Sequence, residues 1–258
     1  LLQPVQTSSV LQMPEKRCPL KVLGLSQNFA ADWLFMNCNM ASIAENINSL
    51  KKQVPENVQL IAVSKTKPPA LLLEAYASGQ RLFGENYVQE LTEKHAVLPD
   101  DIEWHFIGHL QSNKVKYIAP FVHWIHGVDS LRLLREISKQ ASKHNRIIHC
   151  MLQVHIASEE SKFGFSADEI RQECSLFDAS EFPNIALCGL MGMASFTTDV
   201  DVIRSEFKHL KTLFDELQHG PFQHVRTFTA LSMGMSSDWP IAVEEGSTMI
   251  RVGSAIFG

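Results

Sequence analysis

The fold is predicted from the stretch Val58-Gln59-Leu60-Ile61-Ala62-Val63-Ser64 and from the segment that follows it. This run is apolar, rich in β-branched residues and of strand length, so it predicts a β-strand. After the turn Ser64-Lys65-Thr66-Lys67-Pro68-Pro69, helical spacing of apolar residues returns over residues 70–78. A strand followed by a helix is the unit of α/β proteins with parallel sheets.

The same alternation continues along the chain from Met40. Strands are predicted at 58–64, 81–84, 103–108, 122–128, 147–157, 185–194, 225–233 and 248–252. Helices are predicted between them, most clearly at 70–78, 88–95, 131–143, 167–177, 202–218 and 240–245. Eight strands at about 27 residues per unit are close to the size of a (β/α)8 barrel. We therefore expect a single α/β domain with the TIM-barrel architecture.

The alternative architecture is a doubly wound open sheet. That fold, when it binds a dinucleotide, carries a G-x-G-x-x-G turn after its first strand. Here the corresponding turn reads Ser64-Lys65-Thr66-Lys67-Pro68-Pro69, which contains no glycine. The barrel is therefore favoured over the open sheet.

The composition excludes several classes of protein. The 258 residues are 45% hydrophobic and 20% charged with a formal net charge of −5, which excludes a disordered or fibrous chain and disfavours nucleic acid as a partner. No apolar run is long enough to span a membrane. The five cysteines are odd in number and contain no C-x-x-C pair, which argues against a disulfide framework and a zinc site. These features favour a reducing cytoplasm.

Residues 1–39 differ from the rest of the chain. They show no helical or alternating period and mix Gln, Ser, Asn and Pro with scattered apolar residues. Polar residues interrupt the segment that would have to be the apolar core of a signal peptide. A helical stripe then begins after Met40, with Ile43, Ile47 and Leu50 on one face. We interpret 1–39 as a dispensable extension, with an extra docking segment as the alternative, and 40–258 as the barrel.

In such a barrel the functional residues lie where strands end and βα loops begin, and phosphate sites favour the loops after strands seven and eight. Here strand seven ends in Leu231-Ser232-Met233-Gly234-Met235-Ser236, and strand eight in Arg251-Val252-Gly253-Ser254-Ala255. Both segments place a glycine near a hydroxyl residue, where backbone N–H groups can approach a phosphate. Glycine–serine turns also commonly terminate strands without binding anything. The pattern indicates a phosphate site here because it occurs in both loops where phosphate sites of such barrels form.

Lys65 stands directly after the apolar run of the first strand, so its amine is expected at the rim of the core. A partly desolvated lysine has a lowered pKa, and its neutral amine can form a Schiff base with an aldehyde. The alternative is a strand-end lysine that extends into water. A lysine together with phosphate loops points to pyridoxal 5'-phosphate, which carries an aldehyde and a phosphate on one ring.

No metal site is expected. His123 and His126 lie three residues apart on a predicted strand, so their side chains point to opposite faces and cannot share a metal ion.

Five segments of the chain form a specific set of motifs. They are Ala62-Val63-Ser64-Lys65-Thr66-Lys67-Pro68, Phe83-Gly84-Glu85-Asn86-Tyr87-Val88-Gln89-Glu90, Trp104-His105-Phe106-Ile107-Gly108-His109-Leu110-Gln111-Ser112-Asn113-Lys114, Leu231-Ser232-Met233-Gly234-Met235-Ser236 with Asp238, and Gly246-Ser247-Thr248-Met249-Ile250-Arg251-Val252-Gly253-Ser254-Ala255-Ile256-Phe257-Gly258. These segments closely resemble, in the same order, the YggS/PROSC family of pyridoxal phosphate homeostasis proteins, and the resemblance runs from about Met40 to the last residue.

The resemblance implies a monomeric, cytoplasmic barrel similar to the N-terminal domain of alanine racemase. It implies pyridoxal phosphate as the cofactor and apo pyridoxal phosphate enzymes as transient partners. The family's cofactor-binding residues fall on Lys65 (Schiff base), Asn86 (near the cofactor), Ser232, Gly234, Ser236, Gly253 and Ser254 (phosphate) and Arg251 (pyridine side). The chain departs from the family pattern at Ser254, where threonine is frequent, at His109, where proline is frequent, and in having no tail after the final Phe-Gly.

The resemblance also implies a carrier without dedicated catalysis, and the residues favour the same interpretation. A racemase of this architecture needs a second base, usually a tyrosine from another domain, and the chain as given ends with its eighth strand. Tyr76, Tyr87 and Tyr117 all fall on predicted helices. An arginine such as Arg251 beside the ring nitrogen keeps that nitrogen unprotonated and weakens the ring as an electron sink.

Two alternatives to the carrier stay open: a racemase-like enzyme, and a barrel that binds another phosphorylated metabolite. The sequence also leaves open the roles of two further lysines. Lys67 is a possible substitute amine two residues after Lys65, and Lys162, in the loop after the fifth strand, is a possible transfer site.

Overall fold

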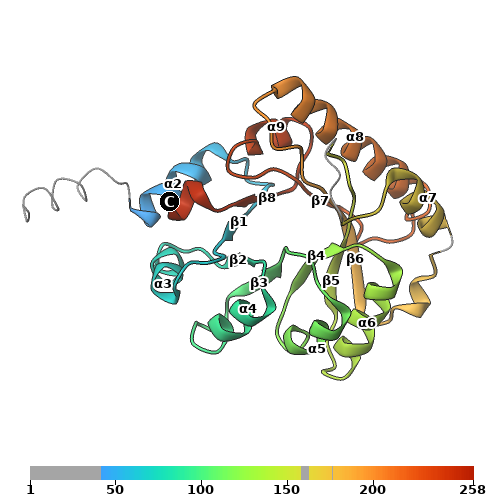
Figure 1. The fold of residues 1–258 in the computed structure, drawn as a ribbon, viewed down its shortest axis with the longest axis horizontal. Helices are drawn as coiled ribbons and strands as arrows, with labels where there is room; N and C mark the ends of the chain where they lie inside the picture. The colour runs from blue at the N-terminus through green and yellow to red at the C-terminus, as the bar shows by residue number, and fades with distance from the viewer. Residues whose placement is uncertain (1–41, 158–162, 176) are drawn as a thin grey trace, which may run out of the picture. The chain divides into compact units, whose positions relative to one another are not determined.

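The computed structural model describes residues 42–157, 163–175 and 177–258, and within them eight parallel strands form a closed barrel. The strands are hydrogen-bonded in chain order, and β8 pairs with β1 to close the ring. Figure 1 shows the strands at the centre with helices around them. The predicted (β/α)8 architecture is confirmed. The proposed boundary between residues 39 and 40 lies outside the described residues.

The eight strands occur where the apolar runs predicted them. They are β1 (Gln59–Val63), β2 (Leu82–Glu85), β3 (Glu103–Phe106), β4 (Trp124–Val128), β5 (Ile148–Gln153), β6 (Ile185–Met191), β7 (Ala230–Ser232) and β8 (Met249–Val252). The largest difference is at β7, which is much shorter than the predicted 225–233. The backbone before β7 forms turns instead, with hydrogen bonds from the Val225 N–H to the Phe222 carbonyl and from the Phe228 N–H to the Val225 carbonyl, and the Phe228 ring packs against Phe214 and Phe222.

The helices cover the outside of the barrel. They are α2 (Ile43–Gln53), α3 (Pro69–Ala77), α4 (Val88–His95), α5 (Val115–Ile118), α6 (Leu131–Ser142), α7 (Ala167–Ser175), α8 (Val200–His219), α9 (Trp239–Glu244) and α10 (Ser254–Phe257), with the 3-10 turns η1 (Ser112–Lys114) and η2 (Ala179–Glu181). The six predicted helices are present with ends within two residues of those expected. No residue range was predicted for the four-residue helices α5 and α10, because one turn is too short to show a period, although Tyr117 of α5 was expected on a helix.

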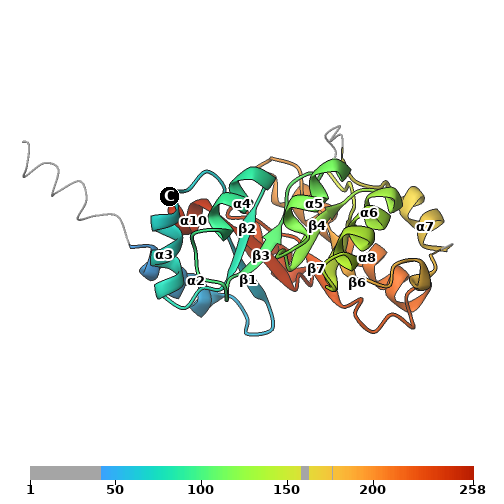
Figure 2. The same ribbon diagram turned by 90° about the horizontal axis from the view of Figure 1, so that it is seen from below.

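Helix α2 precedes the first strand and confirms the helical stripe predicted after Met40. Its apolar residues Ile43, Ile47 and Leu50 are buried. Ser42 and Glu45 form a capping box at its N-terminus, which satisfies two otherwise free N–H groups. The Asn46 amide donates a 3.0 Å hydrogen bond to the Ile256 carbonyl of α10, and Figure 2 shows the two helices next to each other.

The core has two parts. The larger one packs the strands against the helices. The smaller one consists of strand residues alone and fills the interior of the barrel; it comprises Ile61, Met151, Cys188, Met191, Ala230 and Met249. The barrel interior is thus packed with side chains, as expected for an eight-stranded barrel.

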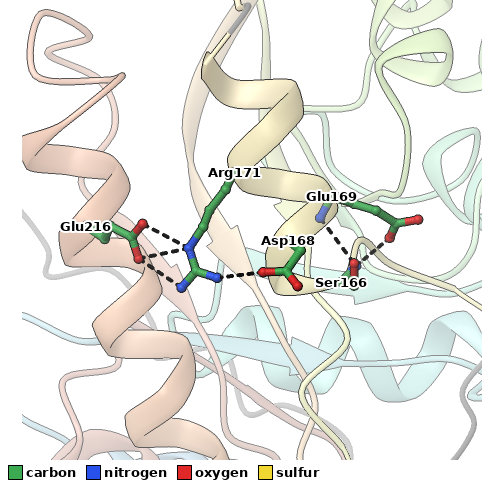
Figure 3. A network of polar contacts seen from close by, with 5 residues as sticks. All are labelled: Ser166, Asp168, Glu169, Arg171 and Glu216. Atoms are coloured by element: carbon green, nitrogen blue, oxygen red, sulfur yellow. Dashed lines mark hydrogen bonds and ion pairs between the residues drawn. The ribbon is translucent and has the colours of Figure 1, made fainter.

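Ion pairs join neighbouring helices on the outer surface. Arg171 of α7 lies 2.9 Å from a carboxylate oxygen of Glu216 on α8 and 3.2 Å from Asp168 on its own helix (Figure 3). Ser166 and Glu169 cap the start of α7 in the same view. Exposed pairs of this kind contribute about 0–1 kcal/mol each, so we interpret the network as structural.

Other classes of site are also sparse in the described part of the chain. Cys150, Cys174 and Cys188 are free and buried. In residues 42–157, 163–175 and 177–258 no cluster of metal-ligating side chains occurs. None of the helices described is both long enough and apolar enough to cross a bilayer.

Candidate functional site

The residues predicted to form the site lie on or directly after four adjacent strands, β7, β8, β1 and β2. The register explains this proximity, because Ala62 of β1 is opposite Val252 of β8, and Val63 is opposite Gly84 of β2. Lys65 therefore follows a strand flanked by the strand before Asn86 and the strand before Gly253. All these residues stand at the carboxyl ends of the strands, where barrel sites form.

The two predicted phosphate loops are in direct contact. The Ser236 hydroxyl accepts hydrogen bonds from the backbone N–H groups of Gly253, at 3.2 Å, and Ala255, at 3.5 Å. Ser254 is exposed and is the first residue of α10. The structure thus brings Ser236, Gly253 and Ser254 together at one point of the rim.

Gly234 is required by the backbone of the first of these loops. Its φ is +96°, in the left-handed region that favours glycine. A Cβ atom at this position would lie 2.7 Å from the Cβ of Ala242. A larger residue at Gly234 would therefore require both a strained backbone and a shift of Ala242.

Lys65 is exposed in the turn after β1, so the partial desolvation expected from the sequence is not found. The chain leaves the sheet at Ser64, and the turn is closed by a 3.0 Å hydrogen bond from the Lys67 N–H to the Ser64 carbonyl. Thr66 has a φ of +63°, which is rare for a β-branched residue. The turn therefore places Lys65 outside the apolar strand, at the carboxyl end of β1.

A buried ionic cluster lies beneath this turn. Lys94 of α4 is 3% exposed, and its ammonium is 2.7 Å from carboxylate oxygens of both Glu85 and Glu90. The Ser64 hydroxyl donates to the same Glu85 oxygen at 2.6 Å. Burial raises the pKa of Glu85, while hydrogen bonds from Lys94 and Ser64 act in the opposite direction. The cluster fixes the ends of β1 and β2 to α4.

Arg251 is buried on β8 and lies beside Ser232. Its guanidinium donates to the Ser232 hydroxyl at 2.5 Å and to the Gly192 carbonyl at 2.9 Å. Burial lowers the pKa of Arg251 to about 10, so the side chain is still charged at neutral pH. The sequence grouped Ser232 with the phosphate serines, but the structure places its hydroxyl on Arg251, because strand alternation turns both side chains into the barrel.

Two buried histidines extend this contact across the barrel. His126 Nδ1 is 3.1 Å from the Ser232 hydroxyl, and His126 Nε2 is 2.9 Å from His105 Nδ1. Burial lowers the pKa of His105 to about 3 and that of His126 well below 6.5, so both rings are neutral at neutral pH. Because Ser232 already accepts from Arg251, its own proton is available to His126.

Asn86 follows β2 with a polar atom that lacks a partner. Its Oδ1 is buried and forms no hydrogen bond with the described residues. The backbone of Asn86 passes so close to Gly108 that a Cβ there would lie 2.4 Å from the Asn86 carbonyl oxygen. A cavity of about 860 Å³ opens beside Asn86, lined also by Phe106, His109 and Lys114.

Tyr87 corrects one step of the sequence argument. It was assigned to a helix, but it is the N-cap of α4, two residues after the end of β2, and it is 59% exposed beside Asn86. Tyr76 lies in α3 and Tyr117 in α5, as expected. One tyrosine therefore does lie at the rim of the barrel.

The two further lysines differ in what the structure describes. The Lys67 ammonium donates to the main-chain oxygen of Gly258 at 2.6 Å and to that of Phe257 at 3.4 Å. Lys67 is therefore already bound to the end of α10. Lys162 lies outside the described residues.

Sequence reasoning missed the side chains behind the candidate residues. Glu90 and Lys94 have the i,i+4 spacing of an ordinary surface pair on a helix, which gave no sign of burial. His105 entered the sequence argument only as part of the segment 104–114, with no role assigned to it. The available signal was that His105, His126, Ser232 and Arg251 all occupy predicted strands, where polar side chains need buried partners.

Comparison with known proteins places this geometry in context. The family model "Alanine racemase, N-terminal domain" matches residues 38–258. The chain is 41% identical over 234 residues to the pyridoxal phosphate homeostasis protein of Vibrio alginolyticus, covering 85% of this chain and 98% of that one. It is 40% identical over 202 residues to the protein of that name from Aquifex aeolicus, covering 78% and 86%. The structure of PipY from Synechococcus elongatus with PLP bound is similar, with a TM-score of 0.76 and 41% identity, covering 84% of this chain and 100% of PipY.

Proposed function

This chain belongs to the family of the pyridoxal phosphate homeostasis proteins, within the alanine racemase N-terminal domain fold, and we propose that it binds pyridoxal 5'-phosphate at the ends of β7, β8, β1 and β2. The observation that carries the proposal is the convergence of one exposed lysine, two contacting glycine–serine loops and one buried arginine on these strands. That donor set matches an aldehyde, a phosphate and a ring nitrogen.

The phosphate is assigned to the loops after β7 and β8. Ser236 already accepts two backbone N–H groups, so its hydroxyl proton is free to donate to an anion. Ser254 offers a second hydroxyl, and Gly253 leaves its backbone open to close approach. A phosphate bound here would receive charge-assisted hydrogen bonds, which are stronger than neutral ones.

Lys65 is assigned to covalent attachment. The cofactor supplies an aldehyde, which condenses with a lysine amine to a Schiff base with loss of one water. Within the described residues the Lys65 amine forms no hydrogen bond or ion pair, so it is free for that reaction. Lys67 is excluded as the first choice because the end of α10 holds its ammonium.

Arg251 and Asn86 are assigned to the ring. The buried guanidinium of Arg251 remains protonated at neutral pH and can donate to a ring nitrogen that lacks a proton. Asn86 Oδ1 is a buried acceptor with no hydrogen-bond partner among the described residues, as expected of an atom that contacts a ligand. Ser232 is assigned to holding Arg251 rather than to the phosphate.

We further propose a non-catalytic role in cytoplasmic homeostasis, in which a monomer holds the cofactor and delivers it to apo-enzymes by transient contact. A cation at the ring nitrogen weakens the electron withdrawal that transamination or decarboxylation requires. The second candidate is a racemase-like enzyme, and the position of Tyr87 at the rim favours it. Racemisation assays with alanine and other amino acids distinguish the two.

The test is reduction with borohydride after incubation with pyridoxal phosphate, followed by mass spectrometry of peptides. The adduct is expected on Lys65. Lys65→Ala should abolish the visible absorption band, and Lys67→Ala is the matched control that should retain it. An adduct found chiefly on another lysine of the wild-type chain would overturn the assignment of Lys65.

A further inference from the structure

Lys94 is a buried cation with an acceptor for each of its protons. Its Nζ lies 2.7 Å from the Ser64 carbonyl, 2.7 Å from Glu85 Oε1 and 2.7 Å from Glu90 Oε1. A lysine ammonium has three N–H donors, so every donor is matched. A lysine that is only 3% exposed is unusual, and its burial is possible here because each donor has a partner.

Stability alone gives no reason for charges at this position. Replacing buried ion pairs with well-packed apolar side chains is often neutral or stabilising, because the charges lose their hydration. Leu91, one turn earlier on α4, is buried without a polar partner. The cluster therefore calls for an explanation in terms of the geometry that it fixes.

The geometry that it fixes is the backbone on both sides of Lys65. Lys94 holds the Ser64 carbonyl, which belongs to the peptide group before Lys65. Glu90 Oε1 accepts the Thr66 N–H at 2.6 Å, which belongs to the peptide group after Lys65. The same Glu90 oxygen also accepts from Lys94, so one ion pair of α4 holds both peptide groups.

The turn needs such a restraint because of Thr66. Its φ of +63° is disfavoured for any residue with a Cβ, and more so for a β-branched one. Without an acceptor for its N–H, Thr66 would relax toward negative φ and rotate the preceding residue. Lys65 would then leave its place between Asn86 and Gly253.

We infer that Glu90 and Lys94 are positioning residues for Lys65: they hold the strained turn so that the Lys65 amine is presented to an aldehyde at the mouth of the barrel. This inference rests on the proposed attachment of the cofactor to Lys65. Neither side chain touches the aldehyde. Their role is to keep the turn in the one conformation that serves the attachment.

The central variant is Glu90→Ala, which leaves Lys94 paired with Glu85 and so keeps the buried charges balanced. The rate of covalent attachment, trapped by borohydride at Lys65, is expected to fall about tenfold, within the 5- to 30-fold range set by the cost of a left-handed conformation. Glu90→Gln retains an oxygen acceptor and should lose no more than about threefold. Glu93→Ala, on the same helix, is the matched control and should attach at the wild-type rate.

Two further measurements separate positioning from a general loss of structure. Amide hydrogen exchange of Thr66 in the protein without cofactor should speed up in Glu90→Ala and stay slow in Glu93→Ala. Thr66→Gly in the Glu90→Ala background should restore the attachment rate, because glycine adopts positive φ at little cost. Should Glu90→Ala fail to fold, Glu90→Asp keeps the charge while shortening the reach to Thr66, and should give the same two changes.

The outcomes are distinct. If the wild-type chain attaches the cofactor at Lys65, but neither the exchange nor the attachment rate responds to Glu90→Ala, the inference is refuted and the proposed function stands. A slower rate that Thr66→Gly does not restore also refutes it. If the wild-type chain attaches no cofactor at Lys65, the proposed function and this inference are overturned together.

Discussion

Replacing Ser236 tests the assignment of the phosphate most directly. In the structure its hydroxyl oxygen accepts from the N–H groups of Gly253 and Ala255, so its proton is the one group left to donate to a ligand. A hydrogen bond to a charged acceptor contributes about 1.5–3 kcal/mol. Since 1.4 kcal/mol corresponds to a tenfold change in affinity, Ser236→Ala should raise the dissociation constant for pyridoxal phosphate by about 10- to 150-fold.

The matched ligand is pyridoxal, which has the aldehyde and the ring but no phosphate. Its affinity should change by less than about threefold, because the removed donor does not reach it. Both constants are measured by titration of the Lys65→Ala background, so that covalent attachment does not mask binding. Ser237→Ala, at the exposed neighbouring serine, is the control for a general effect on the loop.

Adding Ser254→Ala should weaken phosphate binding further, but by less than the sum of the single effects, because the two loops are in contact. Equal weakening of pyridoxal phosphate and pyridoxal would mean that these loops do not hold the phosphate. A fall in melting temperature that accounts for the whole change would also refute the reasoning.

Three further predictions follow from the packing and the titratable groups. Gly234→Ala should lower the free energy of unfolding in urea by about 2–4 kcal/mol, because alanine at this position has an unfavourable positive φ and overpacks the loop. Gly79 also has a positive φ, but no atom lies within 4 Å of the new Cβ, so Gly79→Ala should cost only about 1–2 kcal/mol. Similar losses in the two variants would refute the packing argument. A histidine in the unfolded chain has a pKa of about 6.5, whereas burial lowers the pKa of folded His105 to about 3. Between these values the unfolded chain binds a proton that the folded protein does not, so the free energy of unfolding should fall as the pH drops from 6.5 toward 3. His105→Phe should lose part of that dependence in unfolding curves at pH 7.5 and 5, and an unchanged dependence would contradict the buried, neutral state of the ring. A chain that starts at Met40 should bind pyridoxal phosphate and melt as the full chain does, and a loss of several degrees in melting temperature would show that residues 1–39 contribute to the fold.

The architecture was predictable because it depends on short-range pattern. The apolar run ending at Val63 and the helical stripe of α2 are local signals, and burial confirms both. The start of β7 was not predictable, since residues 225–228 have the composition of a strand but form a turn in which the Phe228 ring packs against Phe214 and Phe222.

The candidate site was predictable in its position and less so in its contacts. Lys65, Asn86 and the two glycine–serine loops could be placed because strand ends meet at one face of a barrel. The partners of Ser232 and the burial of Lys94 depend on how distant elements pack, which residue spacing does not encode. In the sequence Glu90 and Lys94 resemble an exposed ion pair on a helix. In the structure Lys94 is buried because α4 packs against the ends of β1 and β2.

The seam between β8 and β1 has a consequence for the order of events during synthesis. The strand that precedes Lys65 is the first of the barrel to be made, whereas Arg251 lies on the eighth strand, and Gly253 and Ser254 directly follow it. Under the proposed assignment, a nascent chain without β8 exposes Lys65 but lacks Arg251 and the second of the two loops assigned to the phosphate, so full recognition of the ligand requires the ring to close. A ligand bound at the proposed site would link the turn after β1 to β8 and to the loop that follows it, and by mass action each increase in its free concentration would disfavour opening at that seam.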